Sequence, residues 1–200
     1  MAACGTRLSK GCGLTRRPAR FAGSAPPERG PRRADWGMPV QRLNHAVLYV
    51  RDVGRSGAFY RDVLGFETRH EIPGKALFLV APGSRNDHDL GLFAVGDQAS
   101  PSEAGTRSVG LYHLAWEVET LEELGRLRSV LAAAGALVGA SDHGTSKSLY
   151  ARDPDGIEFE VGWMVPRELW GDVPLQTAPL DLDAAVAEYG ADTPSNSLTR

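Results

Sequence analysis

Between residues 40 and 163, the spacing of apolar and polar positions predicts the same order of strands and helix twice. Residues 40–50 are rich in β-branched and aromatic side chains, which is typical of a strand. In residues 54–64 the apolar positions recur at helical spacing, and Gly65 stands where a helix commonly ends. Three strand-like runs follow, separated by Pro- and Gly-containing breakers, at residues 66–71, 75–81 and 89–95. This half of the chain therefore predicts the order βαβββ.

The second succession begins with a strand at residues 111–118. A helix is expected to start at Thr120, because its hydroxyl and Glu123 form a capping box, and to end at Gly135. A strand at residues 136–140 and a hairpin follow. The hairpin strands, 148–151 and 157–161, are joined by Asp-Pro-Asp-Gly at 153–156, which we call the DPDG turn.

The two halves can be superposed. LNHAVLYV (43–50) and LYHLAWEV (111–118) share Leu, His and Val at matching positions, with an offset of 68 residues, and each precedes a helix that ends at glycine. Such self-similarity indicates an internal duplication. We therefore predict an α+β fold of two paired βαβββ modules. The expected divisions are a basic leader (1–39), modules at 40–97 and 111–163, a linker (98–110) and a tail (164–200) with a helix at 182–189 behind Asp181.

Charge separates the leader from the rest. The net charge is −3, but residues 1–40 carry +6 and the remainder −9. The leader is rich in Gly, Pro, Ala and Arg without an apolar period, and we interpret it as disordered. Two alternatives stay open: it is a transit peptide, although its prolines disfavour an amphipathic helix, or Met38 is the true start.

The composition of the residues after the leader indicates which partners and which cellular location to expect. An acidic body argues against nucleic acid, and no apolar run is long enough to span a membrane. Both cysteines, Cys4 and Cys12, lie in the leader, so the modules have no thiolate metal site and suit a reducing cytoplasm.

Candidate chemistry comes from the duplicated histidines. A single histidine is more often a structural residue than a ligand, but His45 and His113 occupy equivalent strand positions, and pairing of the modules would bring them to one cavity. Alternation in the last hairpin strand places Glu158 and Glu160 on one face, from which Glu160 can reach that cavity. Two imidazoles and a carboxylate form a facial triad that suits Fe(II), with Mn(II) or Zn(II) as alternatives.

With this set of residues, the sequence resembles the vicinal oxygen chelate superfamily, which includes glyoxalase I, fosfomycin-resistance proteins and extradiol ring-cleaving dioxygenases. The resemblance covers about residues 41–163 and is most specific in 52–67 and in DPDGIEFEV (153–161). It implies two modules that close into a curved mixed sheet, a cup around a metal held by His45, His113 and Glu160. Ile157 departs from the pattern, because the family usually has Asn after the DPDG turn.

Within that resemblance, the chain is most similar to short catechol 2,3-dioxygenase-like members. Gly91 stands where glyoxalase I has a fourth, carboxylate ligand. Tyr150, ten residues before Glu160, and His143 match residues of ring-cleaving dioxygenases, which implies that they hold the substrate oxygens and move protons. The larger enzymes carry an acid/base histidine where this chain has Gln98. His88 is the substitute that the sequence offers, and it is equally well interpreted as a solvated loop residue.

The leading hypothesis is thus an Fe(II)-dependent extradiol-type dioxygenase that acts on a catechol-like aromatic and O₂. One alternative keeps the metal but changes the reaction to that of a glyoxalase-like lyase or isomerase, or a thiol transferase. Another is a non-catalytic resistance protein that binds a small molecule. The tail can lie over the cavity mouth or in a homodimer interface, and the sequence does not decide between them.

Overall fold

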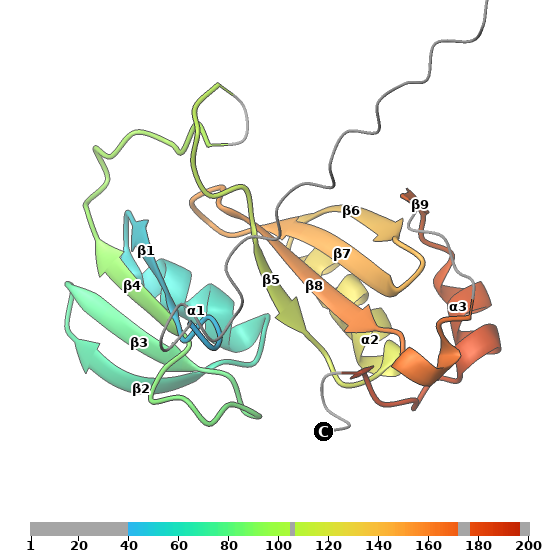
Figure 1. The fold of residues 1–200 in the computed structure, drawn as a ribbon. Helices are drawn as coiled ribbons and strands as arrows, with labels where there is room; N and C mark the ends of the chain where they lie inside the picture. The colour runs from blue at the N-terminus through green and yellow to red at the C-terminus, as the bar shows by residue number, and fades with distance from the viewer. Residues whose placement is uncertain (1–39, 105–106, 172–176, 197–200) are drawn as a thin grey trace, which may run out of the picture. The chain divides into compact units, whose positions relative to one another are not determined.

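The computed structural model describes residues 40–104, 107–171 and 177–196, so the predicted leader lies outside the described residues. The first sheet has the strand order β1-β4-β3-β2, and helix α1 (Val53–Asp62) lies behind it in Figure 1. Strands β1 and β4 pair in parallel, whereas β4, β3 and β2 pair antiparallel. The strand bounds are Ala46–Val50 (β1), Glu67–Ile72 (β2), Ala76–Val80 (β3) and Leu90–Ala94 (β4).

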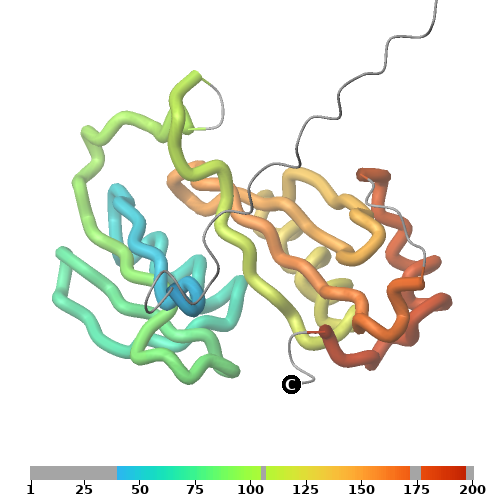
Figure 2. The backbone as a smooth tube through the Cα atoms, viewed as in Figure 1, coloured from blue at the N-terminus to red at the C-terminus, as the bar shows by residue number. Residues whose placement is uncertain are grey.

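The second sheet repeats this topology. Its order is β5-β8-β7-β6-β9, with β5 parallel to β8 and helix α2 (Leu121–Ala133) between β5 and β6 in the chain. The bounds are Leu114–Glu117 (β5), Leu137–Asp142 (β6), Ser146–Arg152 (β7), Glu158–Met164 (β8) and Ala178–Pro179 (β9). The predicted α+β fold with two mixed βαβββ sheets is confirmed. Figure 2 traces the segment that leads from β4 to β5. The residue limits of the modules, linker and tail stay predictions.

Side-chain caps fix where both long helices begin. Asp52 Oδ1 accepts a hydrogen bond from the amide of Arg55 at 2.6 Å, so α1 starts one residue earlier than predicted. Thr120 Oγ1 accepts from the amide of Glu123 at 3.2 Å, as the capping box predicts. Glu123 itself accepts from the amide of Glu119, the residue before the predicted cap.

Strands β1 and β5 are shorter than the predicted ones. The parallel ladder to β4 begins at Ala46, opposite Leu90, and that to β8 begins at Leu114, opposite Phe159. Since neither ladder includes them, His45 and His113 each lie one residue before their strand.

The tail packs on the helix-covered side of the second sheet. Helix α3 (Leu182–Tyr189) starts behind Asp181, which caps the amide of Ala184 at 3.0 Å, as predicted. Its Ala185 joins the core formed by the buried faces of α2 and β8. A short 3-10 turn (Arg167–Leu169) precedes it. None of the described helices is long and apolar enough to cross a membrane.

The DPDG turn at the tip of the β7–β8 hairpin contacts the start of α1. The Asp155 side chain is only 6% exposed and forms ion pairs with Arg51 Nη1 at 2.9 Å and Arg55 Nη2 at 2.7 Å. Its Oδ2 also accepts from the amide of Arg51 at 3.1 Å and from Ser56 Oγ at 3.2 Å. One carboxylate of the second module is thus satisfied by four donors of the first.

The other aspartate of the turn is buried as well. Asp153 Oδ1 accepts from the amides of Asp155 at 2.9 Å and Ile157 at 2.8 Å, and its Oδ2 accepts from the Tyr60 hydroxyl at 3.2 Å. Gly156 supplies the positive φ, +83°, that closes the turn. Burial raises the pKa of Asp153, although the two amide donors oppose that effect.

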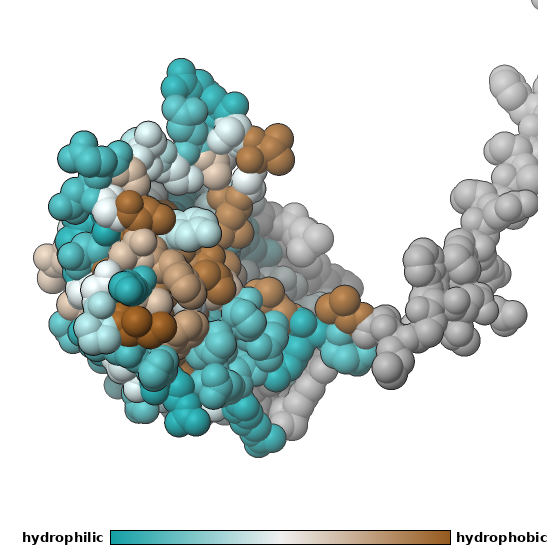
Figure 3. Space-filling model, turned by 90° about the vertical axis from the view of Figure 1, so that its left-hand side faces the viewer, coloured by the Kyte–Doolittle hydropathy of each residue, from teal (hydrophilic) through white to brown (hydrophobic). Residues whose placement is uncertain are grey.

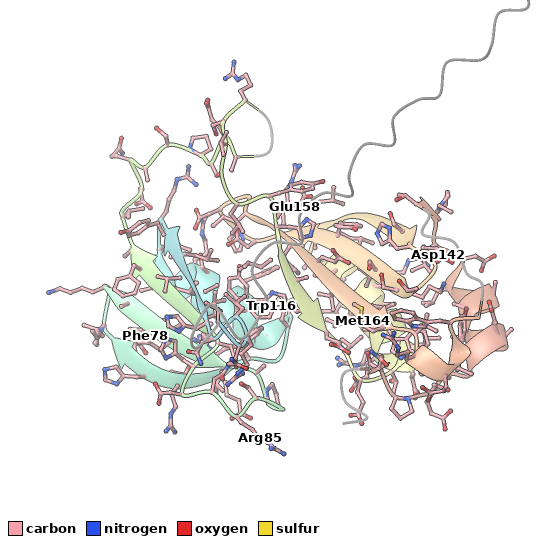
Figure 4. The ribbon with its side chains drawn as sticks, viewed as in Figure 1. Phe78, Arg85, Trp116, Asp142, Glu158 and Met164 are labelled. Atoms are coloured by element: carbon pink, nitrogen blue, oxygen red, sulfur yellow. The ribbon has the colours of Figure 1, made fainter. Side chains whose placement is uncertain are left out.

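Aromatic rings extend the contact between the modules. Phe59 of α1 meets Phe159 of β8 edge-to-face at 6.0 Å between centroids. Phe66 meets Trp116 of β5 in the same way at 5.1 Å, and Trp116 packs against both hydrophobic cores (Figure 4). Such pairs add about 0.5–1.5 kcal/mol each beyond the area they bury.

We expect Asp155→Ala to lower the free energy of unfolding by about 3 kcal/mol, because it leaves the part-buried Arg51 without its charge partner. Urea denaturation measures the loss. Glu103→Ala is the matched control, since its ion pair with Arg107 is exposed and worth about 0–1 kcal/mol. Equal losses in the two variants would contradict a stabilising contact at Asp155.

Asp153 should impose a pH dependence on stability. Its pKa is raised above 3.8 in the folded protein, so its favourable contribution is complete below 3.8 and is lost as the pH rises through the folded-state value. Asp153→Asn keeps a side-chain oxygen that can accept the two amide hydrogen bonds, and it has no carboxyl group to ionise, so its stability should not fall with rising pH at this position. Urea denaturation at a series of pH values from about 3 upward should show the free energy of unfolding of Asp153→Asn rising relative to that of the parent. A difference that is constant with pH would argue against a raised pKa.

Candidate functional site

The structure brings His113 and Glu160 together. Ala115 of β5 lies opposite Glu160 of β8, and Glu160 lies on the face opposite the buried Phe159 and Val161. His113 precedes β5, and its Nε2 is 3.1 Å from Glu160 Oε2. The two side chains are 25% and 13% exposed, so both are reachable from outside.

The geometry of this pair is suitable for a divalent cation. Two neighbouring ligands, each about 2.1 Å from a metal, lie about 3 Å from one another when the angle at the metal is near 90°. The observed 3.1 Å matches that separation, and it is also the length of a direct hydrogen bond between the imidazole and the carboxylate. In addition, His113 Nδ1 is buried and has no hydrogen-bond partner in the described part of the chain. Nδ1 is separated from Nε2 by Cε1, so a cation between Nε2 and Glu160 would not satisfy it, and a water is the partner that such a buried atom commonly has.

Tyr150 and His143 continue the group. Tyr150 of β7 lies opposite Glu160, and its ring is 5.8 Å from that of His113. The Tyr150 hydroxyl is 2.8 Å from His143 Nε2. Burial, followed by the nearby Glu160 carboxylate, raises the pKa of Tyr150 above 10.0. His113, Glu160, Tyr150 and His143 therefore form a continuous row, which we call the module-two row.

Glu158 shares the face of Glu160 but has a different partner. Its Oε2 is 3.4 Å from Nη2 of Arg152, directly across the hairpin. Figure 4 shows Glu158 at the DPDG end of the hairpin, far along β8 from Met164. The contact with Arg152 accounts for the charge of Glu158 on this face.

His45 and His88 lie in the first module and contact each other. Their ring centroids are 4.5 Å apart, and His45 Nδ1 is 2.8 Å from Asn44 Oδ1. His88 Nδ1 is 3.1 Å from Asp87 Oδ2, and its ring meets Phe78 edge-to-face. Within the ranges that the structure describes, no three His, Cys, Asp or Glu side chains are grouped closely enough to hold a metal ion. The structure thus brings together two of the three predicted ligands.

A small cavity of about 160 Å³ connects His45 with the second sheet. Its lining includes His45 and the β5 residues Leu114, Ala115 and Trp116. Ala115 is the neighbour of Glu160 in the ladder between β5 and β8. His45 therefore lies beside the strand that adjoins Glu160, although not in contact with the carboxylate.

Gly91 occupies the position in β4 that Glu160 occupies in β8. The parallel ladders pair Val47 with Gly91 and Ala115 with Glu160, and both pairs lie two residues after the duplicated histidines. The first module therefore has no carboxylate equivalent to Glu160, which agrees with the expectation from the sequence.

Two adjoining cavities lie beneath the segment that leads to β5. They measure about 340 and 390 Å³ and share Ser102, Ala104, Leu111 and Ile157. Tyr49 lines the first, and Tyr112, whose ring is 4.8 Å from that of His113, lines the second. Figure 3 shows apolar side chains gathered on one face of the molecule, and the exposed apolar residues of the first module include Val47, Phe93 and Val95.

One residue of the site was missed in the sequence. Ser148 is fully buried, and its hydroxyl has no partner in the described segments. It lies two residues before Tyr150 and so on the same face of β7. That alternation is the signal that would have found it.

Residues 42–161 match the sequence profile of the Glyoxalase/Bleomycin resistance protein/Dioxygenase superfamily. The chain is 32% identical over 154 residues to catechol-2,3-dioxygenase of Bacillus subtilis (strain 168), covering 74% of this chain and 52% of that protein. It is 29% identical over 184 residues to metapyrocatechase 2 of Cupriavidus necator, covering 86% and 54%. The chain therefore spans about half the length of the curated relatives it matches.

A crystal structure of a glyoxylase/bleomycin resistance protein/dioxygenase domain from Frankia sp. EAN1pec is also similar. It is 27% identical with a TM-score of 0.53, and the match covers 64% of this chain and all of that one. This likeness supports the assignment of the fold.

Removing the charge of Glu160 should lower the pKa of Tyr150, because a nearby carboxylate disfavours the phenolate. We expect Glu160→Gln to move it part of the way towards 10.0, since burial, the larger cause, remains. Ultraviolet titration of tyrosinate measures the change, and Tyr150→Phe identifies the band. An unchanged pKa in Glu160→Gln would mean that the two side chains do not interact.

Proposed function

Because the chain belongs to the Glyoxalase/Bleomycin resistance protein/Dioxygenase superfamily, we propose that it is an Fe(II)-dependent extradiol-type dioxygenase that opens the ring of a catechol-like aromatic. The observation that carries this proposal is the module-two row, in which two metal-ligand types adjoin a tyrosine–histidine pair. The names of the relatives, catechol-2,3-dioxygenase and metapyrocatechase 2, support the same reaction class.

His113 and Glu160 would hold the metal, and His45 would complete the set from the first module. The ion is Fe(II) in this proposal, and the same donors also suit Mn(II) or Zn(II). When bound, Fe(II) supplies a Lewis acid for both catechol oxygens and a site where O₂ reacts. A four-ligand glyoxalase-type centre is not what we propose, because the position equivalent to Glu160 in the first module is Gly91.

Tyr150 and His143 would handle the proton of the substrate. Since its pKa is raised, Tyr150 stays protonated at neutral pH and can donate a hydrogen bond to a substrate oxygen. When a catechol hydroxyl gives its proton to Tyr150 Oη, the tyrosine can pass its own proton to His143 Nε2, 2.8 Å away. His88, in contact with His45, would act as a second proton carrier on the side of the first module.

The two adjoining cavities would receive the organic part of the substrate. The first cavity, lined by Tyr49 and Leu111, is mainly apolar and suits an aromatic ring. The second, lined by Tyr112 together with Arg152 and Glu158, is as polar as it is apolar and suits the polar groups of the substrate. The proximity of Tyr112 to His113 would direct that ring towards the proposed metal ligands.

Anaerobic reconstitution with Fe(II), followed by a panel of catechols and O₂, tests the reaction. We expect a ring-opened chromophore, and we expect Tyr150→Phe to reduce kcat by about 10²–10⁴-fold while the metal stays bound, as for loss of a general acid–base group. His70→Ala, on an exposed strand, is the control and should retain the parent rate. Metal-loaded parent protein that opens no catechol in the panel would refute the proposal.

A further inference from the structure

Lys147 is a buried lysine on β7. Its neighbours in the alternating pattern, Leu149 and Ala151, are fully buried, and Lys147 itself is 3% exposed. Its side chain therefore lies on the face opposite Ser148 and Tyr150. Because a buried ammonium is costly unless it is paired, its partners indicate what it stabilises.

Those partners flank His143 on both sides. Lys147 Nζ lies 2.6 Å from Asp142 Oδ1 and 3.1 Å from the carbonyl oxygen of Gly144. The same Asp142 oxygen accepts from the amide of Gly144 at 2.7 Å. One ammonium thus binds the residues immediately before and after the histidine that contacts Tyr150.

The backbone of this turn has little freedom left. The amide of His143 donates to the Ser146 carbonyl at 2.9 Å, and Gly144 has a φ of +78°, which favours glycine. Helix α3 covers the remaining side of the lysine, because the Tyr189 ring lies 5.4 Å from Nζ, within range of a cation–π contact.

We infer that Lys147 is a positioning residue: by binding Asp142 and Gly144, its buried ammonium holds the turn that presents His143 Nε2 to the Tyr150 hydroxyl. The contact between His143 and Tyr150 is observed in the structure. Its use in proton transfer rests on the proposed function. Helix α3 contributes to this positioning, because its Tyr189 ring lies over the ammonium of Lys147.

A double-mutant cycle followed by nuclear magnetic resonance tests the inference without an activity assay. In protein labelled with ¹⁵N-histidine, Tyr150→Phe should change the chemical shift of His143 Nε2 at fixed pH, because it removes the hydroxyl at 2.8 Å. In the Lys147→Met background we expect that change to be roughly threefold smaller, since the pair no longer meets. Lys75→Met, at an exposed lysine in the β2–β3 turn, should leave it at full size, and Lys147→Arg should restore most of it.

The inference would be overturned if Tyr150→Phe changed the chemical shift of His143 Nε2 as much in the Lys147→Met background as in the parent. It would also be overturned if Lys75→Met reduced that change as much as Lys147→Met does. Thermal unfolding shows whether Lys147→Met folds. If it does not, the double variant Lys147→Met/Asp142→Asn, which removes both charges of the ion pair, replaces it in the double-mutant cycle. In the ring-cleavage assay, Lys147→Met should lower kcat and add nothing to His143→Ala. A positive magnetic-resonance cycle in protein that opens no ring would refute the proposed function and leave the positioning by Lys147 standing.

Discussion

Burial of the two carboxylates of the DPDG turn is the constraint on which the other features depend. A carboxylate removed from water needs donors, and those of Asp155 come from Arg51, Arg55 and Ser56 of the first module. Asp153 in turn binds the amide of Ile157, immediately before β8. The turn therefore joins the modules and fixes where β8 begins. Because strand residues alternate between faces, that starting point also decides that Glu160 faces His113 and Tyr150.

Local patterns predicted most of the fold. Helical periods, the capping box at Thr120 and the DPDG turn each act over a few residues, so the sequence contains them directly. The duplication then indicated two modules of one topology. The exact starts of β1 and β5 escaped prediction, because they depend on where β4 and β8 offer a ladder partner.

The site was predictable only as far as it follows from strand register. Strand alternation and the family resemblance predicted all four residues of the module-two row, and the structure places these four next to one another. The contact of His45 with His88 joins residues 43 positions apart, and no local period signals it. Lys147 looks like an ordinary solvated charge in the sequence, although it alternates with Leu149 and Ala151 on the buried face of β7, where the Tyr189 ring of a helix more than 30 residues away lies near its ammonium.

The central claim is that His45 is the third ligand of the metal. X-ray absorption spectroscopy at the iron edge, on anaerobically Fe(II)-loaded protein, counts the imidazoles bound to the metal. The account predicts two in the parent and one in His45→Ala, with Glu160→Ala losing affinity for iron. A spectrum with a single imidazole in the parent, unchanged by His45→Ala, would contradict it.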